Sequence, residues 1–206
     1  MRNLALVWVL AGVAVAFLAA GDGKPPVSTF TDKRDGKVYK IVKIGSQVWF
    51  AENLNYAAEG SVCRYNKIDN CAKYGRLYNW ETALSACPNG THLPTDKEWT
   101  TLMDYAGGER KAGTKLKSTD WKSYKNTPAG TDEYGFAALL GGYGKDGFFG
   151  YAACAGCWWS ATGDVADSVW HWSIYHDFEV MLRRHADKTF LFSVRCVLDD
   201  EKEKRK

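Results

Sequence analysis

Six cysteines constrain the fold of this chain more than any other feature, because an exported chain with an even cysteine count normally forms disulfides. Spacing narrows the possible pairings, since two of the pairs are close neighbours in the sequence. The third pair would close a long loop and restrict the unfolded chain by about 4–5 kcal/mol. The spacing favours disulfides joining Cys63 to Cys71, Cys154 to Cys157, and Cys87 to Cys196.

The first residues predict export. A short positive start is followed by an apolar run, Leu4 to Ala20, and then by small and helix-breaking residues, the pattern of a secretory signal. The alternative is a membrane anchor, but the run is at the lower limit of the ~20 residues that a span needs. Gly21 stands where a lipid-anchored protein needs a cysteine. We expect a signal peptide at 1–21, a linker at 22–30, and a secreted protein (periplasmic, cell-surface or extracellular) without a stable membrane span.

The charges nearly balance, with 27 basic and 24 acidic side chains and a formal net charge of +3. Such a balance gives no electrostatic argument for a nucleic-acid partner. Residues 199–206 mix both signs and predict a charged, disordered tail. Residues 31–198 are enough for one domain with its own core.

Turn signals organise the start of this domain. Within residues 31–51, Asp35-Gly36 and Gly45-Ser46 predict the turns of β-hairpins. Residues 55–75 are polar and predict a loop. Residues 76–87 carry apolar side chains at helical spacing, so we expect a helix that ends before a proline.

A second helix has the clearest boundaries. Thr95 and Glu98 form a capping box, in which each side chain bonds the other residue's backbone amide, and Gly107-Gly108 predicts the end of the helix. Residues 109–134 are polar. Hairpins, two helices and then a series of strands indicate an α+β domain. The expected later strands are 136–140, 158–162, 169–175, 179–183 and 189–197.

No motif predicts a metal or a cofactor. The Gly-rich stretch 141–147 lacks the Ser or Thr that follows the lysine of a phosphate-binding loop. Loop carboxylates such as Asp132 and Asp164 form no calcium-binding series. The histidines lack the spacing of a zinc protease and are expected at the surface or in loop packing; they are His92, His171, His176 and His185.

Cys154 and Cys157 are the sharpest candidates for chemistry. A redox pair normally begins a helix, but these residues follow a Gly-rich loop and precede a strand. A zinc site would need a second matching pair, and Cys63 and Cys71 are too far apart for that. We therefore favour a structural disulfide that pins the loop, with a redox pair or half of a metal site as alternatives.

Aromatic residues make up 14% of the chain, more than a core of this size needs. Aromatic faces can stack on sugars or anchor a protein partner. Trp170 and Trp172 share one face of a predicted strand, which is a platform if exposed and core if buried. The candidate ligand-binding residues are Trp121, Tyr124, Phe148, Phe149, Tyr151, Trp170, Trp172 and Tyr175.

Several segments together resemble a known family. They are YKIVKIGSQVWFAENLNY, YGRLYNWETA, CPNGTHLPTDKEWTTLMDYAGG, GFAALLGGY, WWSAT and FSVRCV, which run from about Thr31 to Val197. In this order they are similar to the Fibrobacter succinogenes major paralogous domain of exported bacterial proteins. That family has no established activity, so the resemblance implies a fold and a location but no reaction.

A wider resemblance concerns the fold. A helix, a cysteine and then G-x-x-L-P-x-x-x-E-W are similar to the C-type lectin-like fold, which the formylglycine-generating enzymes share. That resemblance implies a bridge from Cys87 to Cys196. The Glu-Pro-Asn and Trp-Asn-Asp calcium motifs of sugar-binding lectins are absent. Cys154 and Cys157 also differ in spacing from the copper-binding pair of the enzymes.

The sequence therefore predicts a secreted or cell-surface binding module. Its partner would be a polysaccharide or a surface protein, held by aromatic-rich loops. The alternative is an envelope or scaffold component without a small ligand. An enzyme related to the formylglycine-generating enzymes is the least favoured reading, so we expect no catalytic residues and no cofactor.

Overall fold

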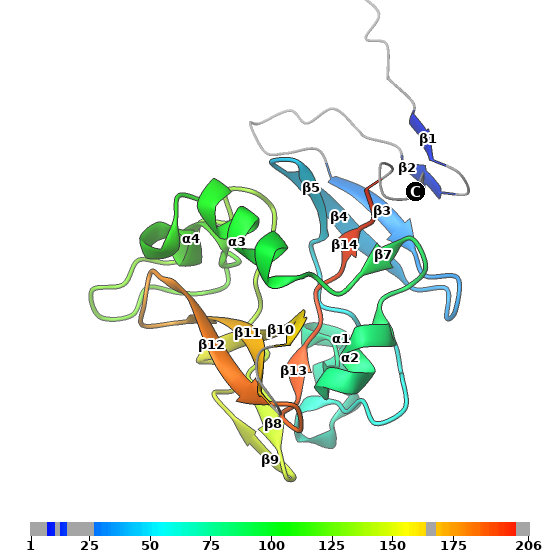
Figure 1. Ribbon diagram of the computed structural model, residues 1–206. Helices are drawn as coiled ribbons and strands as arrows, with labels where there is room; N and C mark the ends of the chain where they lie inside the picture. The colour runs from blue at the N-terminus through cyan, green and yellow to red at the C-terminus, as the bar shows by residue number, and fades with distance from the viewer. Residues whose placement is uncertain (1–7, 11–12, 16–26, 164–167, 201–206) are drawn as a thin grey trace, which may run out of the picture.

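The computed structural model describes residues 8–10, 13–15, 27–163 and 168–200 (Figure 1). Most of the predicted signal and linker, and the tail beyond residue 200, lie outside these residues. Two short strands, β1 (Trp8–Leu10) and β2 (Val13–Val15), pair antiparallel. Within the described ranges, no helix has the length and apolar character needed to cross a membrane.

A first sheet gathers strands from both ends of the domain. Its order is β3 (Val27–Thr31), β4 (Val38–Ile44), β5 (Gln47–Phe50), β14 (Val197–Leu198) and β7 (Thr91–His92), with neighbours antiparallel. The predicted hairpins form the first part of this sheet. Gly36 and Gly45 adopt φ of +74° and +60° in its turns, a conformation that glycine adopts without steric cost.

A second sheet carries most of the chain's later strands. Its order is β12 (Met181–Asp187), β11 (Ser168–Tyr175), β10 (Ala155–Gly163), β13 (Phe192–Ser193) and β6 (Leu77–Tyr78). Neighbours are antiparallel except for β10 and β13, which are parallel. A separate hairpin of β8 (Tyr143–Lys145) and β9 (Phe148–Gly150) projects at one end of the molecule in Figure 1.

Two predicted strands differ from the structure. Residues 189–197 do not form one strand; they divide into β13 in the second sheet and β14 in the first, so this segment connects the two sheets. Residues 136–140 form no strand, because Ala137 has a positive φ of 49° and Ala138 makes only an isolated bridge to Lys117.

Four α-helices lie among the described residues: α1 (Ile68–Tyr74), α2 (Trp80–Ala86), α3 (Asp96–Tyr105) and α4 (Glu109–Leu116). A 3-10 turn, η1 (Arg64–Asn66), precedes α1. The predicted helix at 76–87 is shorter than expected, since Leu77 and Tyr78 join a sheet and the Asn79 side chain caps α2. The capping box at the start of α3 is confirmed. Helix α1 lies in a segment predicted to be a loop, and α4 begins the polar segment 109–134, for which no helix was predicted.

The structure contains two disulfides, Cys63–Cys71 around η1 and α1 and Cys87–Cys196 from the end of α2 to the segment that connects the sheets. The expected disulfide between Cys154 and Cys157 is wrong, because both thiols are free. An extended segment between them carries their Cα atoms about 10 Å apart, too far for a disulfide.

The core is rich in tryptophan on one face of the second sheet. Trp99 of α3 lies against Trp49, Trp158 and Trp172, with ring centroids 4.8, 6.2 and 6.4 Å apart. Helix α3 packs on β10 and β11, and α4 packs on β12. These two helices therefore cover this face.

Candidate functional site

The structure buries two of the aromatic residues expected to bind a ligand. Trp121 and Trp172 are only 3% and 2% exposed. The Trp121 indole donates to the Ala138 carbonyl at 2.7 Å, and the Trp172 indole donates to Asp96 at 3.1 Å. Both therefore belong to the core, and the expectation that they face a ligand is wrong.

The proposed platform of Trp170 and Trp172 is also absent. Trp172 points toward α3, and Trp170 is half-buried beneath the guanidinium of Arg183, which lies 3.3 Å from its ring centroid. Arg183 in turn bonds Asp96 at 2.7 Å, at the start of α3. The helix and its first carboxylate thus cover the face that the strand pattern left open.

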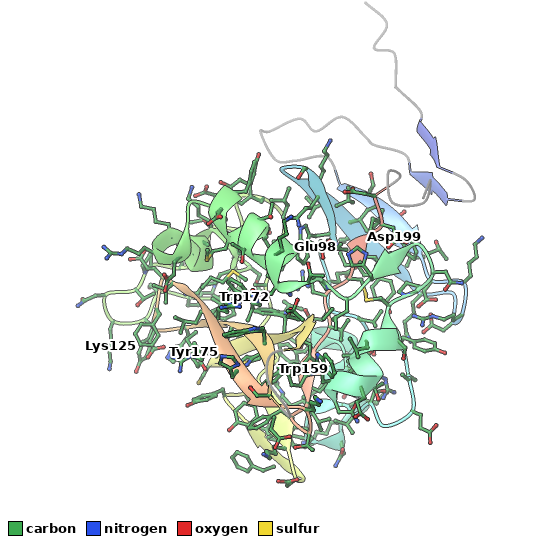
Figure 2. All side chains as sticks on the ribbon, viewed as in Figure 1. Glu98, Lys125, Trp159, Trp172, Tyr175 and Asp199 are labelled. Atoms are coloured by element: carbon green, nitrogen blue, oxygen red, sulfur yellow. A yellow bond between two sulfur atoms is a disulfide. The ribbon has the colours of Figure 1, made fainter. Side chains whose placement is uncertain are left out.

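A groove of about 330 Å³ lies instead where β11 ends and β12 begins, beside the turn before β10. It includes two of the predicted ligand-binding residues, Tyr151 and Tyr175; Figure 2 labels Tyr175 on β11. Its lining is formed by Tyr151, Cys154, Tyr175, His176, Asp177, Phe178, Leu182 and Arg184.

Aromatic rings follow one another along this groove. Tyr175 meets Tyr151 at 5.4 Å and Phe178 at 6.4 Å between centroids, both edge to face. Tyr151 and Phe178 remain 54% and 51% exposed, so their faces are open to solvent. Tyr124 lies near the groove, where its ring meets His176 at 4.4 Å.

The turn that carries Tyr151 is held by backbone contacts. Tyr151 and Ala153 have positive φ of 48° and 60°, a conformation that non-glycine residues adopt only when their surroundings enforce it. The Cys154 amide donates to the Tyr151 carbonyl at 2.9 Å, and the His176 amide donates to the Cys154 carbonyl at 2.8 Å. Hydrogen bonds therefore hold this turn where the sequence predicted a disulfide.

The segment 177–179, which contributes Asp177 and Phe178 to the groove, is held by side chains of a neighbouring segment. The amine of buried Lys117 donates to the Phe178 carbonyl at 2.6 Å, and the Thr127 hydroxyl donates to the Asp177 carbonyl at 2.8 Å. Gly113 allows a close approach, because a Cβ there would lie 2.5 Å from the Glu179 carbonyl. The groove is therefore formed before a ligand arrives, which lowers the entropic cost of binding.

Burial controls the ionisation of two groups beneath the groove. It lowers the pKa of Lys117 to about 8, although Glu179 and Asp177 act in the opposite direction. It also raises the pKa of the Cys157 thiol to about 12. Cys157 is thus an inert core thiol, whereas Cys154 is half-buried and lines the groove.

The two phenylalanines of the predicted set lie elsewhere. Phe148 is 64% exposed in the β8–β9 hairpin, and Phe149 meets Tyr65 edge to face at 5.3 Å. Neither lines the groove. Sequence reasoning missed Phe178 and Arg184. Phe178 was visible as an aromatic residue in a polar loop, but the position of Arg184 depends on the pairing of β11 with β12.

A second cluster of ionisable groups joins distant parts of the chain. His92 bonds Glu98 through Nε2 and Asp199 through Nδ1, each at 2.8 Å; Figure 2 shows Glu98 and Asp199 near each other. The Glu98 hydrogen bond, opposed by burial and aided by Asp199, raises the His92 pKa to about 9. This charged link fastens β7, the start of α3 and the residue after β14. Across the described ranges, no group of His, Cys, Asp and Glu side chains could hold a metal.

Comparison with known proteins gives one informative match. No curated protein sequence and no solved structure shows significant similarity to the chain. The family model of the Fibrobacter succinogenes major domain matches residues 42–198. This range includes all residues of the groove and both five-stranded sheets, apart from β3 and residues 38–41 of β4. The chain therefore belongs to the Fibrobacter succinogenes major domain family.

Proposed function

We propose that this domain is a carbohydrate-binding module and that the groove between Tyr151 and Phe178 is its binding site. The observation that carries the proposal is the pair of exposed rings, both in contact with Tyr175, that line a preformed hollow. The apolar faces of a sugar ring stack on aromatic side chains, while its hydroxyls need a few polar partners at the edge. His176, Asp177 and Arg184 supply such partners.

Binding fits this site better than catalysis. Catalysis by thiols needs an accessible thiolate, and burial keeps Cys157 protonated at neutral pH. Cys154 lines the groove, but the His176 amide and the His176 ring both contact its backbone carbonyl, at 2.8 and 3.2 Å. We therefore propose no catalytic role for either cysteine.

We also propose a C-type lectin-like fold and a location outside the cytoplasm. The Cys87–Cys196 disulfide between the end of a helix and the last strands supports the fold assignment. Two disulfides in one small domain favour an oxidising compartment, as expected of a secreted or cell-surface protein.

The test is retention of the purified protein on a panel of insoluble polysaccharides. We expect retention on at least one of them, and loss of it in the double variant Tyr151→Ala, Phe178→Ala. Phe148→Ala is the matched control, because it removes a more exposed ring outside the groove. Equal retention of the parent and the double variant would place the binding elsewhere. No retention on any polysaccharide would favour the scaffold alternative.

A further inference from the structure

The most informative side chain in the groove is a cation. Arg184 lies on β12, the edge strand of its sheet, and its Cα pairs with that of His171 on β11. Side chains alternate along a strand, so Arg184 and Leu182 face the groove while Arg183 faces α3. Arg183 bonds Asp96 at 2.7 Å, but among the described residues no carboxylate forms an ion pair with Arg184. Arg183 therefore has an anionic partner within the protein, whereas the adjacent Arg184 has none among the described residues.

Neither carboxylate of the segment 177–179 forms an ion pair with Arg184. Asp177 lies 3.9 Å from the His176 imidazole, and the Glu179 carboxylate faces the Thr114 hydroxyl at 3.4 Å. Burial first, and then the charge of Arg184, lowers the pKa of His171 to about 4. His171 is therefore neutral at pH 7, and Arg184 is the permanent cation among the groove-lining residues.

We propose that the groove recognises acidic sugars, with the Arg184 guanidinium binding the carboxylate of a uronic-acid residue whose ring stacks on Tyr151 or Phe178; this inference rests on the proposed carbohydrate-binding function. A guanidinium presents parallel N–H donors that match the two oxygens of a carboxylate. A neutral sugar can use the guanidinium only as a hydrogen-bond donor to its hydroxyls, whereas a uronic acid also gains the attraction between opposite charges. The charge of Arg184 thus contributes more to the selection of acidic over neutral sugars than to overall affinity.

The test compares two polymers that share a backbone. Polygalacturonate carries free carboxylates, whereas highly methyl-esterified pectin has most of them neutralised. We expect the parent protein to bind polygalacturonate at least about tenfold more tightly, as one charge-assisted hydrogen-bonded pair allows, and to lose this preference at high salt. Arg184→Gln should bind both polymers equally.

The matched control is Arg110→Gln, which removes the same charge from an exposed position on α4. It should keep the preference for polygalacturonate. Polyglutamate serves as a second ligand control, because it carries carboxylates without sugar rings, and it should not bind.

Each other outcome contradicts a different part of the proposal. If both polymers bind equally through Tyr151 and Phe178, the carbohydrate-binding function stands and the acidic preference is wrong. If polyglutamate binds as tightly as polygalacturonate, the groove selects anions and the sugar class is wrong. If none of the polymers binds, both the preference for acidic sugars and the proposed binding of these polysaccharides are wrong.

Discussion

The two faces of the β10–β11–β12 sheet both carry aromatic residues, but they differ in what covers them. On one face, Trp158 and Trp172 pack beneath α3 and are almost fully buried. On the other, Trp159 is also buried, against Phe192 and near α2. Only at the end of β11, where Tyr175 meets Tyr151 and Phe178, do aromatic rings stay about half exposed. Aromatic composition alone does not distinguish a core from a binding surface. The difference depends on which part of the sheet the helices cover.

The largest expected effect separates the two faces by stability. Trp172→Ala should lower the free energy of unfolding by about 3–5 kcal/mol, because it leaves a cavity against Trp99 and frees Asp96 from its indole partner. Phe178→Ala should change it by about 0.5 kcal/mol or less, since its ring is exposed. Urea unfolding of both variants measures the contrast, and equal losses would show that the groove also contributes to the core.

A smaller effect is expected at Lys117, which lies between the two regions. Its amine supports the Phe178 carbonyl, and it lies 5.2 Å from the Trp121 ring centroid. Lys117→Met removes the donor from the partly buried Phe178 carbonyl, so we expect a loss of about 1 kcal/mol together with weaker polysaccharide binding. Thr101→Val, which changes an exposed helix residue, is the control for global effects. Weaker binding without a change in unfolding free energy would mean that Lys117 only positions residues 177–179 and does not stabilise the fold.

The link at the start of α3 should depend on pH. The His92 pKa is raised from 6.5 to about 9, so its stabilising contribution is fully present below pH 6.5 and is lost as the pH rises through 9. Since His92 is partly exposed, we expect about 1 kcal/mol after solvent screening.

The difference in unfolding free energy between the parent and His92→Gln, measured from pH 6 to about 10, isolates this contribution. The subtraction is needed because Lys117, with its lowered pKa, stabilises the fold as the pH rises above 8. A difference that does not change with pH would contradict the charged link.

The smallest effect concerns the thiols. A thiol reagent should modify Cys154 in the native protein and Cys157 only after unfolding, because one lines the groove and the other lies in the core with a raised pKa. Stability should hardly change on modification of Cys154. Single Cys→Ser variants assign each reaction, and a native protein whose two thiols react only after reduction would restore the predicted disulfide.

Local signals predicted much of the first half of the fold. The capping box of Thr95 and Glu98 and the turns at Gly36 and Gly45 each depend on neighbours in sequence, and all three occur in the structure. Helix α4 was missed because its buried positions include Gly113 and Thr114, which carry no apolar signal.

The groove depended on information that local patterns do not contain. An alternating strand shows that Trp172 and His171 lie on opposite faces, but not which face α3 covers. The pairing of Arg184 with His171 depends on the register of β11 with β12, and Lys117 reaches Phe178 only through the tertiary fold. Tyr151 and Tyr175 were predicted as single residues, whereas their contact could not be predicted.

The segment that connects the sheets also sets an order of events during folding. Val197 of β14 lies between Trp49 and His92 in the first sheet, so that sheet cannot close until almost the whole domain has emerged. Such distant pairings slow folding, since a long loop must close before the contacts form. The Cys87 thiol cannot form its native disulfide until Cys196 is present. Before then it can form non-native disulfides with any of four other cysteines, Cys63, Cys71, Cys154 and Cys157. We therefore expect oxidative folding of this domain to pass through mispaired species and to be accelerated by a disulfide isomerase.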